Sequence, residues 1–200
     1  PEGMEKAFVH CADFRIRRLS PWGGGDGRTV TLCDLEGMVR TERVCDYVLR
    51  PMARDPALRE GDMRGIYDRL LDGALYDLSV QPREDLDSAA ADLIGGCCVL
   101  FFPGVDRALS CSAGTEEKRS VSDPENEPVV KGARDAFVES LRTNTSLVRR
   151  RLRAPELKIQ EHTVGRQTLT PVDVLWLEGI AAPDTVKEVE RRLDAMDVDG

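Results

Sequence analysis

The segment Val30-Thr-Leu-Cys-Asp-Leu-Glu-Gly37 returns, at a constant offset of 142 positions, as Val172-Asp-Val-Leu-Trp-Leu-Glu-Gly179. A second pair of matching stretches precedes these, Asp13-Phe-Arg-Ile-Arg-Arg18 and Glu156-Leu-Lys-Ile-Gln-Glu161. Their apolar alternation predicts strands, and a helical pattern follows each pair. We therefore predict an α/β protein of two small, related α/β subdomains that share a repeated strand–strand–helix unit.

The second copy and the helix before it show the clearest periodicity. A long helix is expected over 131–153, and Pro155 ends it. Its apolar stripe includes one amide and consists of Phe137, Leu141, Asn144, Val148 and Leu152. Strands over 157–164 and 169–177 follow, and Pro183 opens a final helix that runs to about Met196. The inward residues expected in that final helix are Val186, Val189 and Leu193.

The stretch between the two copies predicts further elements of the first subdomain. A helix carrying Val44, Val48 and Met52 follows the first strand pair. We then expect a helix near 62–74, a short strand near 75–80, a helix over 82–94 and strands over 97–102 and 107–113. The run at 97–102 is apolar without alternation, which indicates a central strand buried on both faces.

A polar stretch containing Pro124 and Pro128 separates the two predicted subdomains. We expect the first subdomain at 1–114, a linker at 115–130 and the second subdomain at 131–200. Residues 1–128 contain 16 Lys and Arg against 24 Asp and Glu, so the net charge of −8 lies in this part. An acidic surface argues against nucleic acid as a partner, because phosphate binding needs a positive field.

The basic residues gather near the end of the long predicted helix. Arg149, Arg150 and Arg151 are consecutive, with Arg142 and Arg153 close by. Cations suit the C-terminus of a helix, so solvated charges are one interpretation. Docking to a partner or to acidic lipid headgroups is another, and nucleic acid is the third.

Six cysteines occupy positions 11, 33, 45, 97, 98 and 111, without a C-x-x-C pair. Three of them, Cys33, Cys97 and Cys98, fall in apolar runs, where a thiol acts as a small hydrophobic group. We expect neither a disulfide nor a metal site, and no cofactor.

Asn144 is the strongest candidate for a functional residue. A buried amide needs partners, so it bonds either to a loop or linker carbonyl or to a ligand or neighbouring subunit. Glu139 and Arg142 lie within one helical turn and would complete a polar patch. Glu36 and Glu178 are expected to be turn residues, and residues 23–27 a hairpin tip. No catalytic triad or nucleophile motif is present, so we expect no enzyme.

Three motifs carry a family resemblance: Val129-Val-Lys-Gly-Ala-Arg-Asp-Ala-Phe-Val-Glu-Ser-Leu-Arg-Thr-Asn-Thr-Ser-Leu-Val-Arg-Arg-Arg-Leu-Arg153, Val164-Gly-Arg-Gln-Thr168 and Trp176-Leu-Glu-Gly-Ile-Ala-Ala-Pro-Asp-Thr-Val186. They resemble the A subunits of bacterial spore germinant receptors, the GerA family. The resemblance implies the hydrophilic N-terminal domain of such a subunit, which contributes to nutrient sensing, signal transmission or receptor assembly.

The resemblance also implies partners and a location. Receptor B and C subunits would be the partners, with self-association through the A subunit and a small-molecule germinant as further possibilities. The full-length protein would lie in the spore inner membrane through its C-terminal region, with this domain soluble on the core side. Two alternatives remain open: a paralogous stage V sporulation membrane protein, and a sensor that binds a small molecule in a cleft between the subdomains. The segment Tyr47-Val-Leu-Arg-Pro-Met52 favours the receptor subunit.

Overall fold

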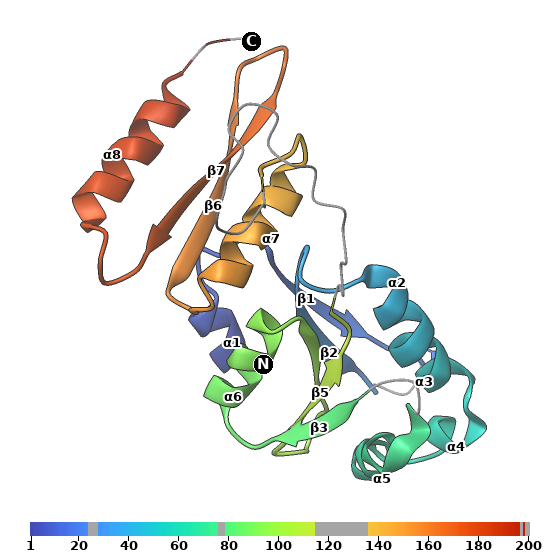
Figure 1. Ribbon diagram of the computed structural model, residues 1–200. Coiled ribbons are helices and arrows are strands. Elements are labelled where there is room, and N and C mark those ends of the chain that lie inside the picture. Colours follow the sequence, from blue (N-terminus) through green and yellow to red (C-terminus); the bar gives the residue numbers. More distant parts are fainter. Residues whose placement is uncertain (24–27, 76–78, 115–135, 197, 199–200) are drawn as a thin grey trace, which may run out of the picture.

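The computed structural model describes residues 1–23, 28–75, 79–114, 136–196 and 198, and contains two antiparallel sheets (Figure 1). The five-stranded sheet has the order β1 (Phe14–Leu19), β2 (Val30–Leu35), β4 (Cys97–Phe101), β5 (Ala108–Ser112), β3 (Val80–Arg83). The second sheet pairs β6 (Leu157–Val164) with β7 (Thr170–Leu177). The helices are α1 (Glu2–Ala7), α2 (Thr41–Val44), η1 (Cys45–Leu49), α3 (Arg50–Arg54), α4 (Pro56–Arg59), α5 (Met63–Arg69), η2 (Leu70–Ala74), α6 (Leu86–Ile94), α7 (Leu141–Arg151) and α8 (Pro183–Asp194). The mixed α/β class predicted from the sequence is confirmed.

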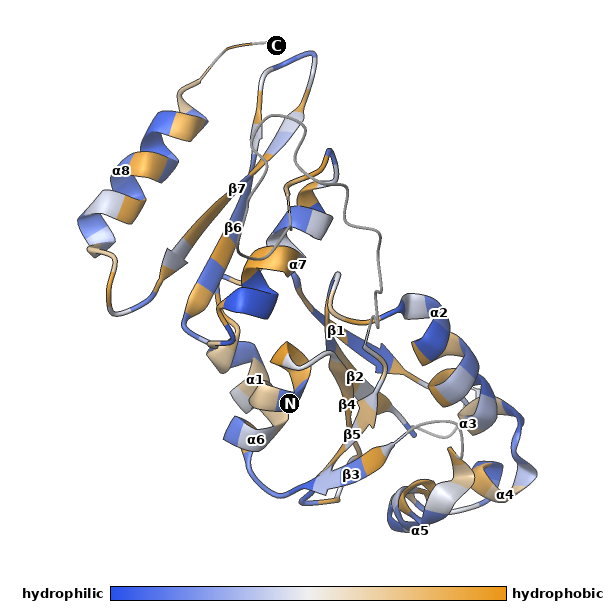
Figure 2. Cartoon of the chain, viewed as in Figure 1, coloured by the Kyte–Doolittle hydropathy of each residue, from blue (hydrophilic) through white to orange (hydrophobic). Residues whose placement is uncertain are grey.

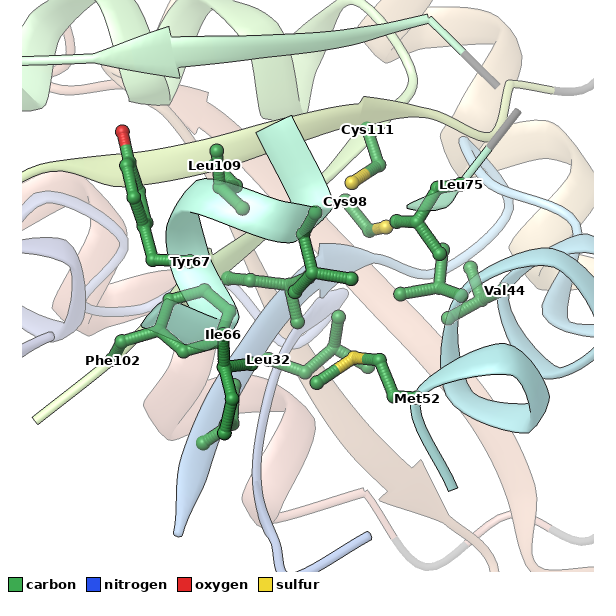
Figure 3. Packing of buried hydrophobic residues seen from close by; sticks show 14 of the residues in the cluster. Leu32, Val44, Met52, Ile66, Tyr67, Leu75, Cys98, Phe102, Leu109 and Cys111 are labelled. Carbon is green, nitrogen blue, oxygen red and sulfur yellow. The ribbon is translucent and has the colours of Figure 1, made fainter. Parts of the chain in front are cut away.

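Helices cover both faces of the five-stranded sheet. On one face, α2 to α5 bury a cluster that includes Val44, Val48 and Met52, as the sequence predicts. The other face carries α1 and α6. Consecutive β4 residues Cys98 and Val99 belong to opposite clusters, which confirms a central strand buried on both faces. Figure 3 shows the first cluster, in which the rings of Tyr67 and Phe102 meet edge to face, with centroids 5.8 Å apart.

The repeated unit is present at the level of elements and register. In the first copy, Phe14 of β1 pairs with Leu35 of β2, and in the second, Leu157 of β6 pairs with Leu177 of β7. The same backbone bond closes each hairpin. Glu36 N–H donates to the Asp13 carbonyl at 2.8 Å, and Glu178 N–H donates to the Glu156 carbonyl at 2.9 Å. Helices follow both hairpins.

The chain segment before β1 joins the two sheets. Ile159 of β6 donates its N–H to the His10 carbonyl at 2.8 Å and accepts from the Ala12 N–H at 2.7 Å. Residues 10–12 therefore extend the edge of β6, and residues 14–19 continue directly into the five-stranded sheet. Figure 1 shows α7 beside β6 and β7 at this junction.

Several predicted boundaries are wrong for local reasons. The helix expected at 82–94 begins at Leu86, because Asp85 caps it by accepting from Ser88 N–H at 2.7 Å, while 80–83 forms β3. Residues 76–78 of the strand expected at 75–80 lie outside the described residues, as do residues 24–27 of the hairpin tip and the whole linker predicted at 115–130.

The long helix expected over 131–153 is shorter. Residues 131–135 lie outside the described ranges, and 136–140 are not helical. The helix begins after Ser140, which has an extended backbone and a hydroxyl that accepts from Thr143 N–H at 3.4 Å. A serine in this position satisfies a free helix N–H, so the capping geometry explains the later start.

Candidate functional site

Helix α7 turns a polar face toward the interior. Its buried residues are Thr145, Ser146 and Arg149. The prediction of an inward apolar stripe is wrong: Phe137 is 70% exposed and Leu152 is 42% exposed. These two residues line a surface pocket of about 620 Å³ together with Leu147, Val148 and Arg151. The polar face of α7 is turned inward because two of its arginines form ion pairs with carboxylates at the junction between the two sheets.

The first of these arginines, Arg149, forms a buried ion pair with Asp13. Its Nε and Nη2 donate to the two Asp13 carboxylate oxygens at 2.6 and 2.9 Å. The side chains are 0% and 2% exposed. Nη2 also reaches the Leu157 carbonyl at 3.4 Å, so the guanidinium contacts both β6 and the segment that leads into β1. The interpretation of Arg149 as a solvated charge is therefore wrong.

The second arginine, Arg142, lies nearer the surface and contacts three carboxylates. Its guanidinium is 3.3 Å from Asp173 of β7 and 3.4 Å from Glu36, and it also pairs with Glu161 of β6. Thr145 donates a second hydrogen bond to Asp173 at 2.9 Å. Since Glu36 directly follows β2, Arg142 connects a carboxylate next to the five-stranded sheet with carboxylates of the β6–β7 sheet.

The turn after β2 packs directly against α7. Gly37 has φ +79°, and a Cβ there would lie 3.0 Å from the Ser146 Cβ and 3.1 Å from the Arg142 carbonyl oxygen. Arg150 donates to the Gly37 carbonyl at 3.5 Å. The repeat-related Gly179 has φ +82° and nothing within 4 Å of the same Cβ position. The two copies therefore share a turn geometry, but only the first turn supports α7.

Of the other predicted site residues, one makes internal hydrogen bonds and two have exposed side chains. Asn144 bonds to both backbone groups of Val138: its Nδ2 donates to the carbonyl and its Oδ1 accepts from the N–H, each at 2.7 Å. The amide is thus an internal tie, the first of the two alternatives. Glu139 is exposed ahead of the helix, and Arg151 is exposed on its outer side.

Asp13 and Lys158 belong to the junction and were missed by the sequence interpretation. Lys158 is buried, and its Nζ donates to the Ala7 carbonyl at 2.9 Å and pairs with Glu178 at 3.3 Å. Its repeat equivalent, Arg15, pairs in the same way with Glu36 at 3.6 Å. The repeat was the signal that could have identified them. In each copy the second residue of the first strand is basic, and a glutamate follows the second strand.

A polar pocket of about 720 Å³ opens beside Glu36. Its lining includes Arg15, Arg40, Thr41 and Tyr47, and within the described part of the chain its lining residues come from positions 15–47. It is therefore not a cleft between the two sheets. Cys11 lies at the junction between the sheets, and burial raises the pKa of its thiol, so this thiol is not activated.

Comparison with known proteins assigns the chain to a family. The family model described as Bacillus/Clostridium GerA spore germination protein matches residues 2–200. The chain belongs to the GerA family. It is 28% identical to spore germination protein KA of Bacillus subtilis (strain 168), over 98% of this chain and 35% of that protein. It is 30% identical to stage V sporulation protein AF of the same organism, over 86% of this chain and 36% of that protein.

A solved structure shares the fold of this GerA-family chain. It is the N-terminal domain of the A subunit of the Bacillus megaterium spore germinant receptor GerK3, with a TM-score of 0.76 and 24% identity. The match covers 98% of this chain and 70% of that domain. The chain spans about a third of the length of the curated relatives. Within the described ranges, no helix has the length and apolarity to cross a membrane.

Proposed function

We propose that this chain is the hydrophilic N-terminal part of a germinant receptor A subunit and that it transmits a conformational signal between its two sheets. In this proposal the full-length protein lies in the spore inner membrane with B and C subunits, and this part faces the core. The family membership and the spore germination names among the relatives support the assignment. The stage V relative remains the alternative.

The position of Arg142 carries the proposal of transmission. Its guanidinium contacts Glu36, which follows β2, and also Glu161 and Asp173 of the second sheet. Arg149 anchors the same helix through a buried ion pair with Asp13. The Arg142 contacts with Glu36 and Glu161 are partly open to water, so they can break at modest cost, whereas the Asp173 side chain is 1% exposed. The buried Arg149 pair cannot break without leaving a bare charge. In this proposal α7 stays fixed at Arg149 and Asp173, while the Arg142 contact with Glu36 opens and closes.

The role proposed here is not catalytic. The carboxylates of the junction are occupied by arginine and lysine side chains, which leaves no paired acid and base aimed at an open site. Ion pairs of this kind suit a structural coupling rather than proton transfer. We propose no cofactor for the same reason.

The pocket beside Glu36 favours a second candidate function, small-molecule sensing. Its mixed acidic and basic lining fits a polar ligand, such as an amino acid or a sugar. A thermal-shift series with amino acids, sugars and inosine tests this candidate. A saturable rise in melting temperature that Arg40→Gln removes would support it, and the absence of any shift would reject it.

The transmission proposal is tested in spores that carry the full-length protein with Arg142→Gln. The matched control is Arg107→Gln, which removes an exposed arginine paired with Glu84 at 3.0 Å on the far side of the five-stranded sheet. We expect slower nutrient-triggered germination with Arg142→Gln at unchanged amounts of receptor in the membrane. A fall in receptor amount would indicate assembly instead. Wild-type germination with the wild-type amount of receptor would reject both roles.

A further inference from the structure

The outer edge of β7 offers backbone groups to another strand. In an antiparallel ladder, hydrogen-bonded and non-hydrogen-bonded pairs alternate. Glu178 N–H bonds to the Glu156 carbonyl, so Trp176 and Val174 also direct their backbone groups toward β6. Asp173 and Leu175 direct theirs away from it. Ile159 confirms this alternation, because it lies opposite Leu175 and uses its own N–H and carbonyl on the far side, with Ala12 and His10.

The first copy of the repeat shows what such an edge binds. At the offset of 142, Asp173 and Leu175 correspond to Thr31 and Cys33 of β2. Those two residues pair with Phe101 and Val99 of the antiparallel strand β4. Strand β7 has no equivalent neighbour: within the described part of the chain it pairs with β6 alone.

Burial differs between the two copies in the same way. All six residues of β2 are buried, whereas no residue of β7 is, although both strands are rich in apolar side chains. Helix α8 also has no buried residue, and its predicted inward Val189 is 38% exposed. Figure 2 shows apolar residues along β7 and α8 at the outer end of the molecule. The apolar core of the second copy is incomplete.

The lengths of the relatives indicate where the missing strand lies. The chain covers 70% of the solved N-terminal domain and about a third of each full-length relative. Because the matched domain is N-terminal in its subunit, most of the remaining length follows it. Downstream polypeptide can therefore supply a strand that pairs with β7 of the second copy, as β4 at residues 97–101 pairs with β2 of the first copy.

We propose that the β7 edge binds an antiparallel strand from the polypeptide that follows residue 200 in the full-length protein. The strand is apolar on both faces, since its counterpart β4 has Cys98, Val99 and Leu100 fully buried. Asp173 and Leu175 form its hydrogen-bonded contacts. Pro171, which cannot donate, lies two positions before Asp173, outside the span that matches the β2–β4 ladder. This pairing would fasten the downstream part of the subunit to the junction described above.

Residue-resolved hydrogen exchange on the isolated full-length subunit in detergent tests the proposal. The amides of Val174 and Trp176 are internal controls, because they bond to β6 whether or not another strand is present. We expect the Asp173 and Leu175 amides to be protected as well, at all protein concentrations. Exchange of these two at unprotected rates would overturn the proposal. Protection that appears only as the subunit dimerises would assign the edge to a second copy and would also overturn it.

A proline substitution identifies the partner strand. Leu175→Pro removes an N–H that β6 does not use, and Leu175→Ala keeps that N–H while shortening the side chain. We expect Leu175→Pro, but not Leu175→Ala, to abolish amide protection in one downstream segment while Val174 and Trp176 stay protected. Unchanged downstream exchange in Leu175→Pro would contradict the proposal. If this variant does not fold, the wild-type exchange measurement decides by itself.

Discussion

Arg149 and Asp13, 136 positions apart in the sequence, form a two-point ion pair that is closed to solvent. The pair joins α7 to the segment that connects the two sheets. Burying two charges is costly, and their attraction offsets that cost only while both partners are present. The pair therefore makes the junction dependent on both residues together.

Replacing one partner should be far more damaging than replacing both. We expect Asp13→Asn to lower the free energy of unfolding by about 3–5 kcal/mol, because Arg149 keeps a buried charge without its counterion. The double variant Asp13→Leu with Arg149→Met should recover most of that loss. Urea unfolding at neutral pH measures both, with Arg107→Gln as a surface control that changes stability by less than about 0.5 kcal/mol. A loss below about 1 kcal/mol in the single variant would show that the pair is not needed.

Phe137 and Ile159 provide a test of how α7 is oriented. Phe137 is 70% exposed, so Phe137→Ala should change the free energy of unfolding by less than about 0.5 kcal/mol. Ile159 is fully buried in β6, and Ile159→Ala should cost about 2–5 kcal/mol. Thermal unfolding of the two variants gives the comparison. A loss of several kcal/mol in Phe137→Ala would contradict the observed orientation of α7 and support the inward apolar stripe that the sequence predicts.

The two repeat-related glycines should respond differently to alanine. Both have positive φ, so each substitution costs about 1–2 kcal/mol through the backbone. Gly37→Ala should cost about 1–3 kcal/mol more, because its Cβ meets Ser146 and the Arg142 carbonyl. Equal losses in chemical unfolding of the two variants would mean that α7 does not press on the Gly37 turn.

The two bonds between Asn144 and Val138 predict a modest stability effect. Asn144→Ala should lower the free energy of unfolding by about 0.5–1.5 kcal/mol, since the contact is partly solvated. Ser140→Ala, which removes the helix cap, should cost about 1 kcal/mol and serves as a comparison on the same helix. If Asn144→Ala leaves stability intact while germination of spores with the full-length variant slows, the amide acts on a partner instead.

Buried thiols predict a loss of stability in alkali. Burial raises the pKa of Cys33 to about 12, against about 8.5 in an unfolded chain. Between these values the folded protein binds more protons than the unfolded one, so stability falls as pH rises above about 8.5. Unfolding at about pH 7 and about pH 10 should show this fall, and Cys33→Ala should reduce it. A fall of the same size in Cys33→Ala would assign the effect to other groups.

Cys98 and Cys111 are paired across β4 and β5, and Figure 3 shows both side chains in the same apolar cluster. The hydrogen bond with the Cys111 thiol, and then burial, raise the pKa of Cys98. The sequence placed both cysteines in strands that the structure confirms, but their pairing depends on the register of two strands joined by a turn.

The sequence was most informative where structure depends on neighbours along the chain. The strand at 157–164 and the helix beginning at Pro183 were predicted at their observed starts, because alternation and capping are local signals. The start of α7 was not, although Ser140 was a readable cap. The apolar positions Phe137 and Leu152 outweighed it, and both are exposed.

The sequence by itself determined the repeat, the α/β class and the family, because these are properties of residue order. It could not determine which side of α7 faces inward, since that depends on Asp13 and on Asp173, which lie far from the helix in the chain. Only the tertiary structure brings those carboxylates together. Their ion pairs with Arg142 and Arg149 decide which face of α7 is buried, in preference to the apolar stripe. The same holds for the outer edge of β7: its sequence resembles that of β2, and the two strands differ because β7 pairs with β6 alone in the described part of the chain.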